Sequence, residues 1–320
     1  WSEYNIKSAM FWLKNNKTAK NNLVVANAED AVIDVNGNLT SPLVINSSSS
    51  QGPTDDRRIK PDITGNGTNL LSTGSNGNSA TTTLTGTSMS SPNVAGTLLL
   101  LQQHHNNLTT KFMKAATLKG LACHTADDSG SIGPDVYFGW GLLNAKAAAQ
   151  AITSNGLNAW ISEEKLNQGQ TYTINVKSLG TSPLMATACW TDVPGTAKDN
   201  QLNSPTPILV NDLDIRIIKG SEEFFPWKLN LAAINAPAIK GDNIVDNVER
   251  VDVDNAQGTY TIQVSHKGSL TGSNQAYSLI VSGFDEIVLS NSSVVKNEFF
   301  VYPNPANDFL NIESPNAFIN

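Results

Sequence analysis

The 320-residue sequence carries little charge and no long apolar run. Lys and Arg number 21 against 28 Asp and Glu, so the formal net charge is −7 and the pI is about 5.1. An acidic chain without a run of Lys or Arg offers no electrostatic surface to nucleic acid or to an anionic membrane. No apolar run approaches the roughly 20 residues that a membrane-spanning helix needs. We therefore expect neither a nucleic-acid partner nor a transmembrane segment.

Cysteine and histidine are also scarce. The two cysteines, Cys123 and Cys189, fall in different predicted domains, where two buried thiols or a bridge between them are both compatible with the sequence. The four histidines lack the spacing of a metal site, since two are adjacent and two stand alone: His104, His105, His124 and His266. The sequence opens on Trp1 without a signal peptide, and we interpret it as an internal piece of a longer protein.

Residues 1–153 show the pattern of a mixed helical and stranded domain. A short apolar strand begins at Leu23–Val25, and residues 36–50 are predicted to be a polar loop. Three helices are expected: a largely buried one from Met89 to about His105, one over Lys111–Lys119 closed by Gly120, and one over Ala145–Ile152 capped by Asn144.

After residue 154 the apolar period changes from helical to two. Five segments alternate in this way, namely Tyr172/Ile174/Val176, Leu184/Ala186/Ala188/Trp190, Leu213/Ile215/Ile217, Tyr260/Ile262/Val264 and Tyr277/Leu279/Val281. Turn-rich stretches separate them, which predicts a β-sandwich over residues 154–286. A polar linker over residues 287–299 and a short further segment over residues 300–320 complete the predicted organisation.

The most specific motif is G-T-S-M-S-S-P-N-V-A-G at Gly86–Gly96. It places Ser88 where a loop becomes a helix, beside backbone N–H groups that have no intrahelical partner. Such groups can stabilise the oxyanion that forms when a serine hydroxyl attacks a carbonyl. An ordinary serine N-cap is the alternative, although an N-cap requires neither the Met, nor the Pro, nor the flanking Gly. We expect the neighbouring Ser90 and Ser91 to tolerate replacement by Ala.

This motif resembles the nucleophile motif of the subtilisin-like serine peptidases, the subtilases. Other stretches resemble further motifs of that family in the family's order: S-S-S-Q-G-P at Ser48–Pro53, K-P-D-I at Lys60–Ile63 and G-W-G-L-L-N-A at Gly139–Ala145. The resemblance covers about residues 20–152. It implies the C-terminal part of a subtilisin-like α/β parallel-sheet domain, with Ser88 as the nucleophile of a serine endopeptidase acting on protein or peptide substrates. Thr64-Gly65-Asn66-Gly67 departs from the family's usual Ala-Pro-Gly, and Asn93 replaces a usual His.

A serine nucleophile also needs a general base and a carboxylate that orients the base. In subtilases the order along the chain is Asp, His, Ser, but residues 1–87 contain no His. His104 and His105 follow Ser88 by about 24 Å along the helix axis. We therefore expect the triad Asp and His, and the oxyanion Asn, to lie outside this sequence, and these 320 residues alone to be inactive.

Asn27 has two interpretations. V-V-A-N-A-E-D at Val24–Asp30 superficially resembles the family element that supplies the oxyanion-hole Asn. The longer stretch A-K-N-N-L-V-V-A-N-A matches a later strand of the family better, which makes Asn27 a strand-end residue near the specificity pocket. Under both interpretations of Asn27, the chemistry of a serine peptidase requires no cofactor.

The second domain contains many carboxylates near predicted strand ends. They are Asp192, Asp212, Asp214, Asp242, Asp246 and Glu249. Oxygen-rich clusters suit structural Ca²⁺, and solvated acidic turns are the alternative because no fixed ligand spacing is present. The strings W-T-D-V-P-G, L-V-N-D-L-D-I and D-N-V-E-R-V-D-V resemble the jelly-roll domain that follows some secreted bacterial subtilases.

The tail V-Y-P-N-P-A-N-D-F-L-N-I-E-S at Val301–Ser314 resembles the start of the C-terminal sorting domain of type IX secretion. This resemblance implies the type IX machinery as a partner and a secreted or cell-surface location in a Bacteroidota-type bacterium. We conclude that the sequence favours a secreted subtilisin-like serine endopeptidase. The alternative function is a non-catalytic surface adhesin or binding protein with a degenerate subtilase fold.

Overall fold

The computed structural model describes residues 13, 15–197, 201, 204–230, 236–288, 300–302 and 311–313. The chain divides into two compact units, residues 1–288 and residues 289–320. In the second unit, β16 (Phe300–Tyr302) pairs antiparallel with β17 (Asn311–Glu313). The rest of the predicted sorting segment, and residues 289–299 of the predicted linker, lie outside the described residues.

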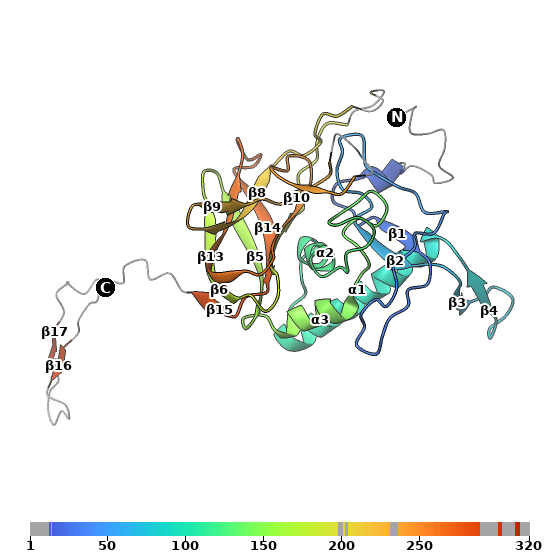
Figure 1. Ribbon diagram of the computed structural model, residues 1–320, viewed down its shortest axis with the longest axis horizontal. Helices are drawn as coiled ribbons and strands as arrows, with labels where there is room; N and C mark the ends of the chain where they lie inside the picture. Colours follow the sequence, from blue (N-terminus) through green and yellow to red (C-terminus); the bar gives the residue numbers. More distant parts are fainter. Residues whose placement is uncertain are drawn as a thin grey trace. The chain divides into compact units, whose positions relative to one another are not determined.

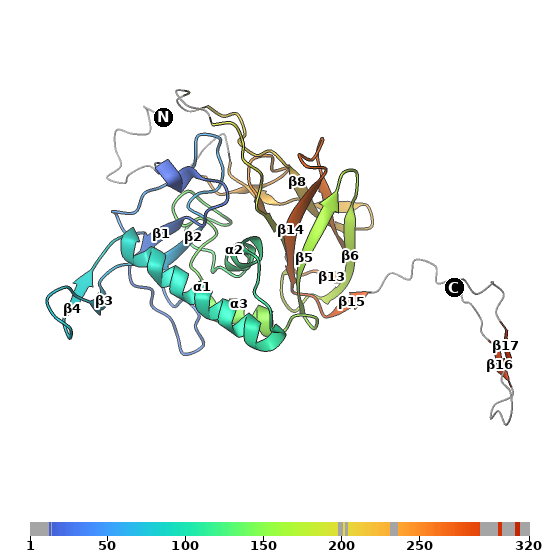
Figure 2. The same ribbon diagram turned by 180° about the vertical axis from the view of Figure 1, so that it is seen from behind.

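The first unit begins with a small parallel sheet and a long helix. A 3₁₀ turn, η1 (Asn15–Thr18), precedes β1 (Val25–Ala28), which pairs in parallel with β2 (Ile63–Asn66) so that Val25 lies opposite Ile63. The predicted strand is therefore present but starts two residues later. A hairpin, β3 (Leu70–Thr73) and β4 (Thr81–Leu84), projects from this part of the fold (Figures 1 and 2) and leads into helix α1 (Thr87–Thr109).

Helix α1 differs from the prediction that it is largely buried. Only Ser90, Val94 and Leu101 are buried, while Leu99 and Leu100 are 70% and 65% exposed. Successive residues of a helix turn by about 100°, so the four consecutive leucines point in different directions and cannot share one face. The buried stripe lies against β1, β2 and α3, and the opposite face has no cover among the described residues.

Helix α2 (Ala115–His124) also differs from the prediction, because Gly120 lies inside the helix and does not end it. The reason is packing: a Cβ on Gly120 would lie 2.8 Å from the Cys189 Cβ and 2.9 Å from the Ile280 Cδ1. The third helix, α3 (Ala145–Thr153), confirms its prediction, since the Asn144 side chain accepts a hydrogen bond of 2.8 Å from the backbone N–H of Ala147.

The second part of the first unit is a sandwich of two antiparallel sheets. One sheet has the order β12-β7-β14-β5 and the other β15-β6-β13-β8-β9. A short pair, β10 with β11, lies outside both sheets. The strands are β5 (Ala159–Asn167), β6 (Tyr172–Leu179), β7 (Leu184–Trp190), β8 (Leu213–Lys219), β9 (Glu222–Phe224), β10 (Trp227–Lys228), β11 (Ile239–Lys240), β12 (Val248–Val253), β13 (Gln257–His266), β14 (Asn274–Ser282) and β15 (Glu286–Val288).

The interior of the sandwich confirms the period-two pattern. The five alternating segments lie in β6, β7, β8, β13 and β14, and their apolar residues face each other in one buried core. Trp190 and Tyr277 are its largest fully buried side chains. Alternation places every second residue on one face of a strand, so the sequence pattern and the core coincide.

The two parts of this unit share buried apolar residues at their junction. Helix α2 lies against the outer face of the sheet that contains β7 and β14, beside β5 (Figures 1 and 2). Cys123 of α2 and Cys189 of β7 belong to one cluster with Ile59, Trp140 and Val248. Both cysteines are free and buried. The predicted boundary between residues 153 and 154 falls between α3 and β5 and stays a prediction. Among the described residues, no helix is long and apolar enough to cross a membrane.

The close approach of α2 to the sandwich gives a matched pair of predictions. Gly120→Ala should lower the free energy of unfolding by about 1–3 kcal/mol, because the added methyl overlaps Cys189 and Ile280. Gly96→Ala, in α1, should raise it by up to about 1 kcal/mol, since nothing lies within 4 Å of the added methyl. Urea unfolding of both variants tests the packing, and equal effects of the two substitutions would contradict it.

Candidate functional site

Ser88 lies in the first turn of α1, as its motif predicts. The helix begins at Thr87, and Gly86 precedes it with φ of 153°, a region that favours glycine. The backbone N–H groups of Met89 and Ser90 both donate to the Gly86 carbonyl, at 2.9 and 3.2 Å. No side chain caps this end of the helix. The Ser88 side chain is exposed and therefore accessible to a substrate.

Two cavities meet at Ser88. The first, of about 320 Å³, is lined by Ser88 together with Leu13, Lys17, Asn22–Val25, Ser50, Thr87 and Ser91. The second, of about 430 Å³, is lined by Ser88 together with Leu70–Thr73, Thr82, Leu84, Met89, Pro92 and Asn93. The first lies on the β1 side of the serine and the second on the side of the hairpin. An extended peptide that crosses Ser88 can therefore place one side chain in each cavity.

Two glycines and a serine bring α1 close to the parallel strands. A Cβ on Gly65 would lie 2.6 Å from the Val94 side chain, and one on Gly67 would lie 2.6 Å from the Ser90 backbone nitrogen and from the Gly86 carbonyl oxygen. The Ser90 hydroxyl is fully buried, 2.7 Å from the carbonyl oxygen of Ala26 in β1 and 2.9 Å from that of Gly65 in β2. The motifs did not predict these roles, although the glycines of Thr64-Gly65-Asn66-Gly67 were a visible signal of close packing.

Asn27 is buried below the turn that carries Ser88. It lies in β1 opposite Gly65, and its side-chain oxygen is 2.6 Å from the position that a Cβ on Gly67 would occupy. Neither polar atom of its side chain has a hydrogen-bond partner among the described residues. Asn27 lines neither cavity at Ser88. Asn27 is thus a strand residue, and its role at the site stays a prediction.

The histidines of the chain are engaged elsewhere. His104 and His105, late in α1, lie 2.8 Å from the Thr153 hydroxyl and 2.9 Å from the Lys111 carbonyl oxygen. His124 is buried between the hydroxyls of Thr187 and Ser282, and this burial lowers its pKa to about 3. His266 accepts a hydrogen bond from the backbone N–H of Gly169. Among the residues that the structure describes, none of these imidazoles is bonded to Ser88.

The predicted calcium ligands are mostly bound to positive side chains or backbone N–H groups. Asp192 pairs with Lys20, and Asp246 accepts hydrogen bonds from Ile59 and Asn243. Asp212, Asp214 and Asp242 surround the ammonium group of Lys267, at 3.4, 2.8 and 2.8 Å, and Arg216 binds the latter two. In the described parts of the chain, no three His, Cys, Asp or Glu side chains could together hold a metal ion.

Glu249, like Asp246, has no ion pair with a Lys or Arg side chain among the described residues. It is fully buried, and its Oε2 accepts the backbone N–H of Ile215, while Oε1 lacks a partner in the described structure. Burial, with the charge of Asp214 added, raises its pKa well above the ordinary value. A protonated carboxyl is a poor calcium ligand. The calcium site stays a prediction.

Comparison with known proteins identifies the part of the chain that contains Ser88. Residues 11–141 match the model of the subtilase family. This part of the chain is therefore similar to the subtilase family. No curated protein matches the chain. The family model confirms the resemblance based on the motifs at Ser48–Pro53, Lys60–Ile63 and Gly86–Gly96, and it supports a serine peptidase in general.

Solved structures with low similarity include two maturation proteases and one larger enzyme. The patellamide maturation protease PatA is 20% identical over 42% of this chain and 43% of its own, with a TM-score of 0.32. The prenylagaramide maturation protease PagA is 22% identical over 42% and 43%, with a TM-score of 0.30. Fervidolysin from Fervidobacterium pennivorans is 16% identical over 73% of this chain and 27% of its own, with a TM-score of 0.33. The chain thus spans less than half the length of each.

The two serines that follow Ser88 should differ in their tolerance of substitution, which corrects the expectation that both are replaceable. Ser90→Ala should lower the free energy of unfolding by about 1–2 kcal/mol, because it removes the hydroxyl that bridges β1 and β2. Ser91→Ala, at an exposed position, should change it by less than about 0.5 kcal/mol. Equal stability of the two variants in urea unfolding would contradict this account of how α1 is held.

The acidic cluster predicts a specific pH dependence. Burial, with the charge of Asp214 added, raises the pKa of Asp212 from 3.8 to about 6. The folded state therefore binds a proton on Asp212 more tightly than the unfolded state does. The resulting stabilisation is complete below about pH 3.8 and is lost as the pH rises through about 6. Asp212→Asn should remove this dependence. Relative to the wild type, its free energy of unfolding should gain about 1 kcal/mol between pH 4 and pH 7, a figure that allows for partial exposure.

Thermal unfolding across this pH range measures the difference. Asp34→Asn provides the control, because a hydrogen bond from the Asn38 backbone lowers the pKa of the exposed Asp34. Above about pH 5 Asp34 is ionised in both the folded and the unfolded state, so its variant should run parallel to the wild type from there to pH 7. An Asp212→Asn profile that also runs parallel to the wild type would show that the Asp212 pKa is not raised.

Proposed function

We propose that this chain is the C-terminal part of a secreted subtilisin-like serine endopeptidase that hydrolyses peptide bonds through an acyl-enzyme on Ser88. One observation carries the proposal: in the segment that matches the subtilase model, an exposed serine lies in the first turn of α1 where two cavities meet. This arrangement suits a peptide backbone passing over a nucleophile. A serine that only capped a helix would need no cavity on either side.

The chemistry divides between this chain and residues outside it. The Ser88 hydroxyl attacks the substrate carbonyl, and the N-terminus of α1 stabilises the oxyanion through its unpaired N–H groups and its dipole. The base that removes the hydroxyl proton, and its orienting carboxylate, belong to a segment upstream of these 320 residues in this proposal. Because no histidine of the described structure is bonded to Ser88, the 320-residue chain by itself should hydrolyse no peptide.

The remaining parts of the chain fit an exported enzyme. The orders β5-β14-β7-β12 and β6-β13-β8-β9 interleave strands from both halves of the sandwich, which supports a jelly roll built from two Greek keys. The motif at Val301–Ser314 supports recognition by the type IX secretion machinery, and hence a secreted or cell-surface location. Bound calcium would be structural in this scheme and take no part in the reaction.

The alternative is a surface adhesin that retains a degenerate subtilase fold. The exposed, uncapped position of Ser88 favours the enzyme, because an adhesin has no need of an accessible hydroxyl at the N-terminus of a helix. An upstream sequence that contains the triad Asp and His would favour the enzyme further, and their absence would favour the adhesin.

Ser88→Ala in the longer gene product should abolish labelling by a fluorophosphonate probe and reduce turnover of casein by about 10⁶, the scale of losing a serine nucleophile in this type of enzyme. Ser79→Ala, an exposed serine on the hairpin between β3 and β4, provides the control and should be labelled like the wild type. The 320-residue chain should not be labelled. Wild-type turnover by the Ser88→Ala protein would exclude this serine as the nucleophile.

A further inference from the structure

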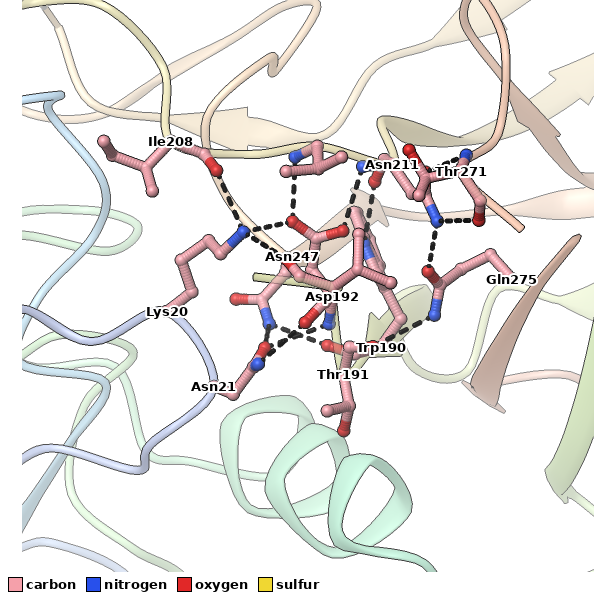
Figure 3. Close-up of polar contacts among 12 residues, drawn as sticks. Lys20, Asn21, Trp190, Thr191, Asp192, Ile208, Asn211, Asn247, Thr271 and Gln275 are labelled. Atoms are coloured by element: carbon pink, nitrogen blue, oxygen red, sulfur yellow. Dashed lines mark hydrogen bonds and ion pairs between the residues drawn. The ribbon is translucent and has the colours of Figure 1, made fainter. Parts of the chain in front are cut away.

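The wall of the first cavity at Ser88 continues directly into a contact with the β-sandwich. Residues Asn22–Val25 form this wall, and Lys20 and Asn21 immediately precede it. Lys20 and Asn21 are hydrogen-bonded to residues of the sandwich more than 170 positions away in the sequence. Figure 3 shows that these two side chains and the loop between β7 and β8 converge on Asp192.

Lys20 is the charged part of this contact. Its side chain is 7% exposed and that of Asp192 is fully buried. The Lys20 ammonium group donates to the Asp192 carboxylate at 2.5 Å and to the backbone carbonyls of Val193 and Ile208 at 2.8 and 2.9 Å. All three N–H donors of the lysine are thereby used, as a buried ammonium group requires.

Asn21 is the neutral part of the contact. Its side-chain amide donates to the Asp192 carbonyl at 2.9 Å, and its side-chain oxygen accepts the Asp192 backbone N–H at 3.0 Å. The Asn247 side chain, just before β12, donates to the same oxygen at 2.9 Å and to the Trp190 carbonyl at 2.7 Å. Asn21 is thus attached to the sandwich just after β7 and just before β12.

Asp192 is itself held rigidly by the sandwich. Its two carboxylate oxygens accept the backbone N–H groups of Val210 and Asn211, at 2.8 and 2.9 Å. Asn211 in turn donates to the Gln275 side chain of β14 (Figure 3). A carboxylate that is fixed by two backbone donors can impose a position on the lysine and the asparagine that bind it.

The opposite side of the same segment is attached to the first part of the unit. Lys119 donates to the carbonyl of Lys20 at 3.1 Å, and Lys60 donates to that of Asn22 at 2.9 Å. The backbone N–H of Val24 donates to Asp62 at 2.7 Å. The cavity wall is therefore held between α2 and β2 on one side and the sandwich on the other.

We propose that Asp192 is a positioning residue for peptide binding: through Lys20 and Asn21, the β-sandwich fixes the Asn22–Val25 wall of the cavity at Ser88. This inference rests on the proposed function. The sandwich then supports the substrate-binding site from outside, because none of its described residues lines the cavity. Ser88 is carried by α1 and not by this wall, so a loosened wall weakens peptide binding and leaves the nucleophile in place.

The first experiment measures the wall directly, in the 320-residue chain and without any need for activity. Hydrogen–deuterium exchange of residues 22–28 is compared in wild type, Asn21→Ala and Asp192→Asn. Asp192→Asn leaves the buried Lys20 without its ion pair and could unfold the chain. Asn21→Ala leaves no buried charge unpaired, so the chain should stay folded. Each substitution removes a contact that restrains residues 22–28, so their hydrogen–deuterium exchange should become about ten-fold faster. Asn175→Ala and Asp285→Ala, which each lose one hydrogen bond within the sandwich, are the controls and should leave exchange unchanged.

The second experiment measures peptide cleavage by the longer gene product with the same substitutions. KM should rise about ten-fold while kcat stays within about two-fold, the pattern of lost ground-state binding. A folded Asn21→Ala protein with unchanged exchange, or with faster exchange and unchanged KM, would overturn the positioning role. A wild-type protein that cleaves no peptide would overturn the proposed function instead, so the two failures are distinct.

Discussion

The first part of the fold depends on one buried carboxylate, that of Asp62. It binds the ammonium groups of Lys60 and Lys119 at 2.5 and 2.9 Å and the backbone N–H of Val24 at 2.7 Å. Burial alone would raise the pKa of Asp62, but Lys119 and Lys60 outweigh it and hold the pKa below its ordinary value. Burial lowers the pKa of Lys60 to about 8. Without the carboxylate two buried ammonium groups would face each other, which is why β2, α2 and the entry to β1 must stay together.

The position of Ser88 follows from this arrangement through backbone contacts. Once β1 and β2 are aligned, α1 can approach them only where Gly65 and Gly67 leave room, and the Ser90 hydroxyl then reaches both strands. The turn at Gly86 is fixed by its N–H bond to the Gly67 carbonyl. The helix N-terminus is consequently placed at the surface, with one cavity on each side of the serine.

The sandwich is joined to this part by charge as well as by apolar packing. Lys20 with Asp192, and Arg250 with the Cys123 carbonyl, cross the junction, and Gly120 allows α2 to lie directly against β7 and β14. Within the sandwich, Lys267 binds three of the six carboxylates that suggested a calcium site. Acidic residues that are close together can thus be neutralised by a lysine that follows a neighbouring strand, here β13, which composition alone does not reveal.

Local patterns in the sequence were sufficient for several features. The alternating segments identified five strands of the sandwich, and Asn144 identified the start of α3. The motif around Ser88 predicted both a helix N-terminus and the match of residues 11–141 to the subtilase model. These features depend on residues that are close in sequence, through side-chain alternation, helix capping and a short motif. The tertiary structure alone decided that Leu99 and Leu100 are exposed, that Gly120 lies inside a helix, and that the Ser90 hydroxyl reaches two strands. It also decided that Asp192 binds Lys20. Each of these depends on a partner far along the chain, and no local pattern encodes which distant residue fills a neighbouring position.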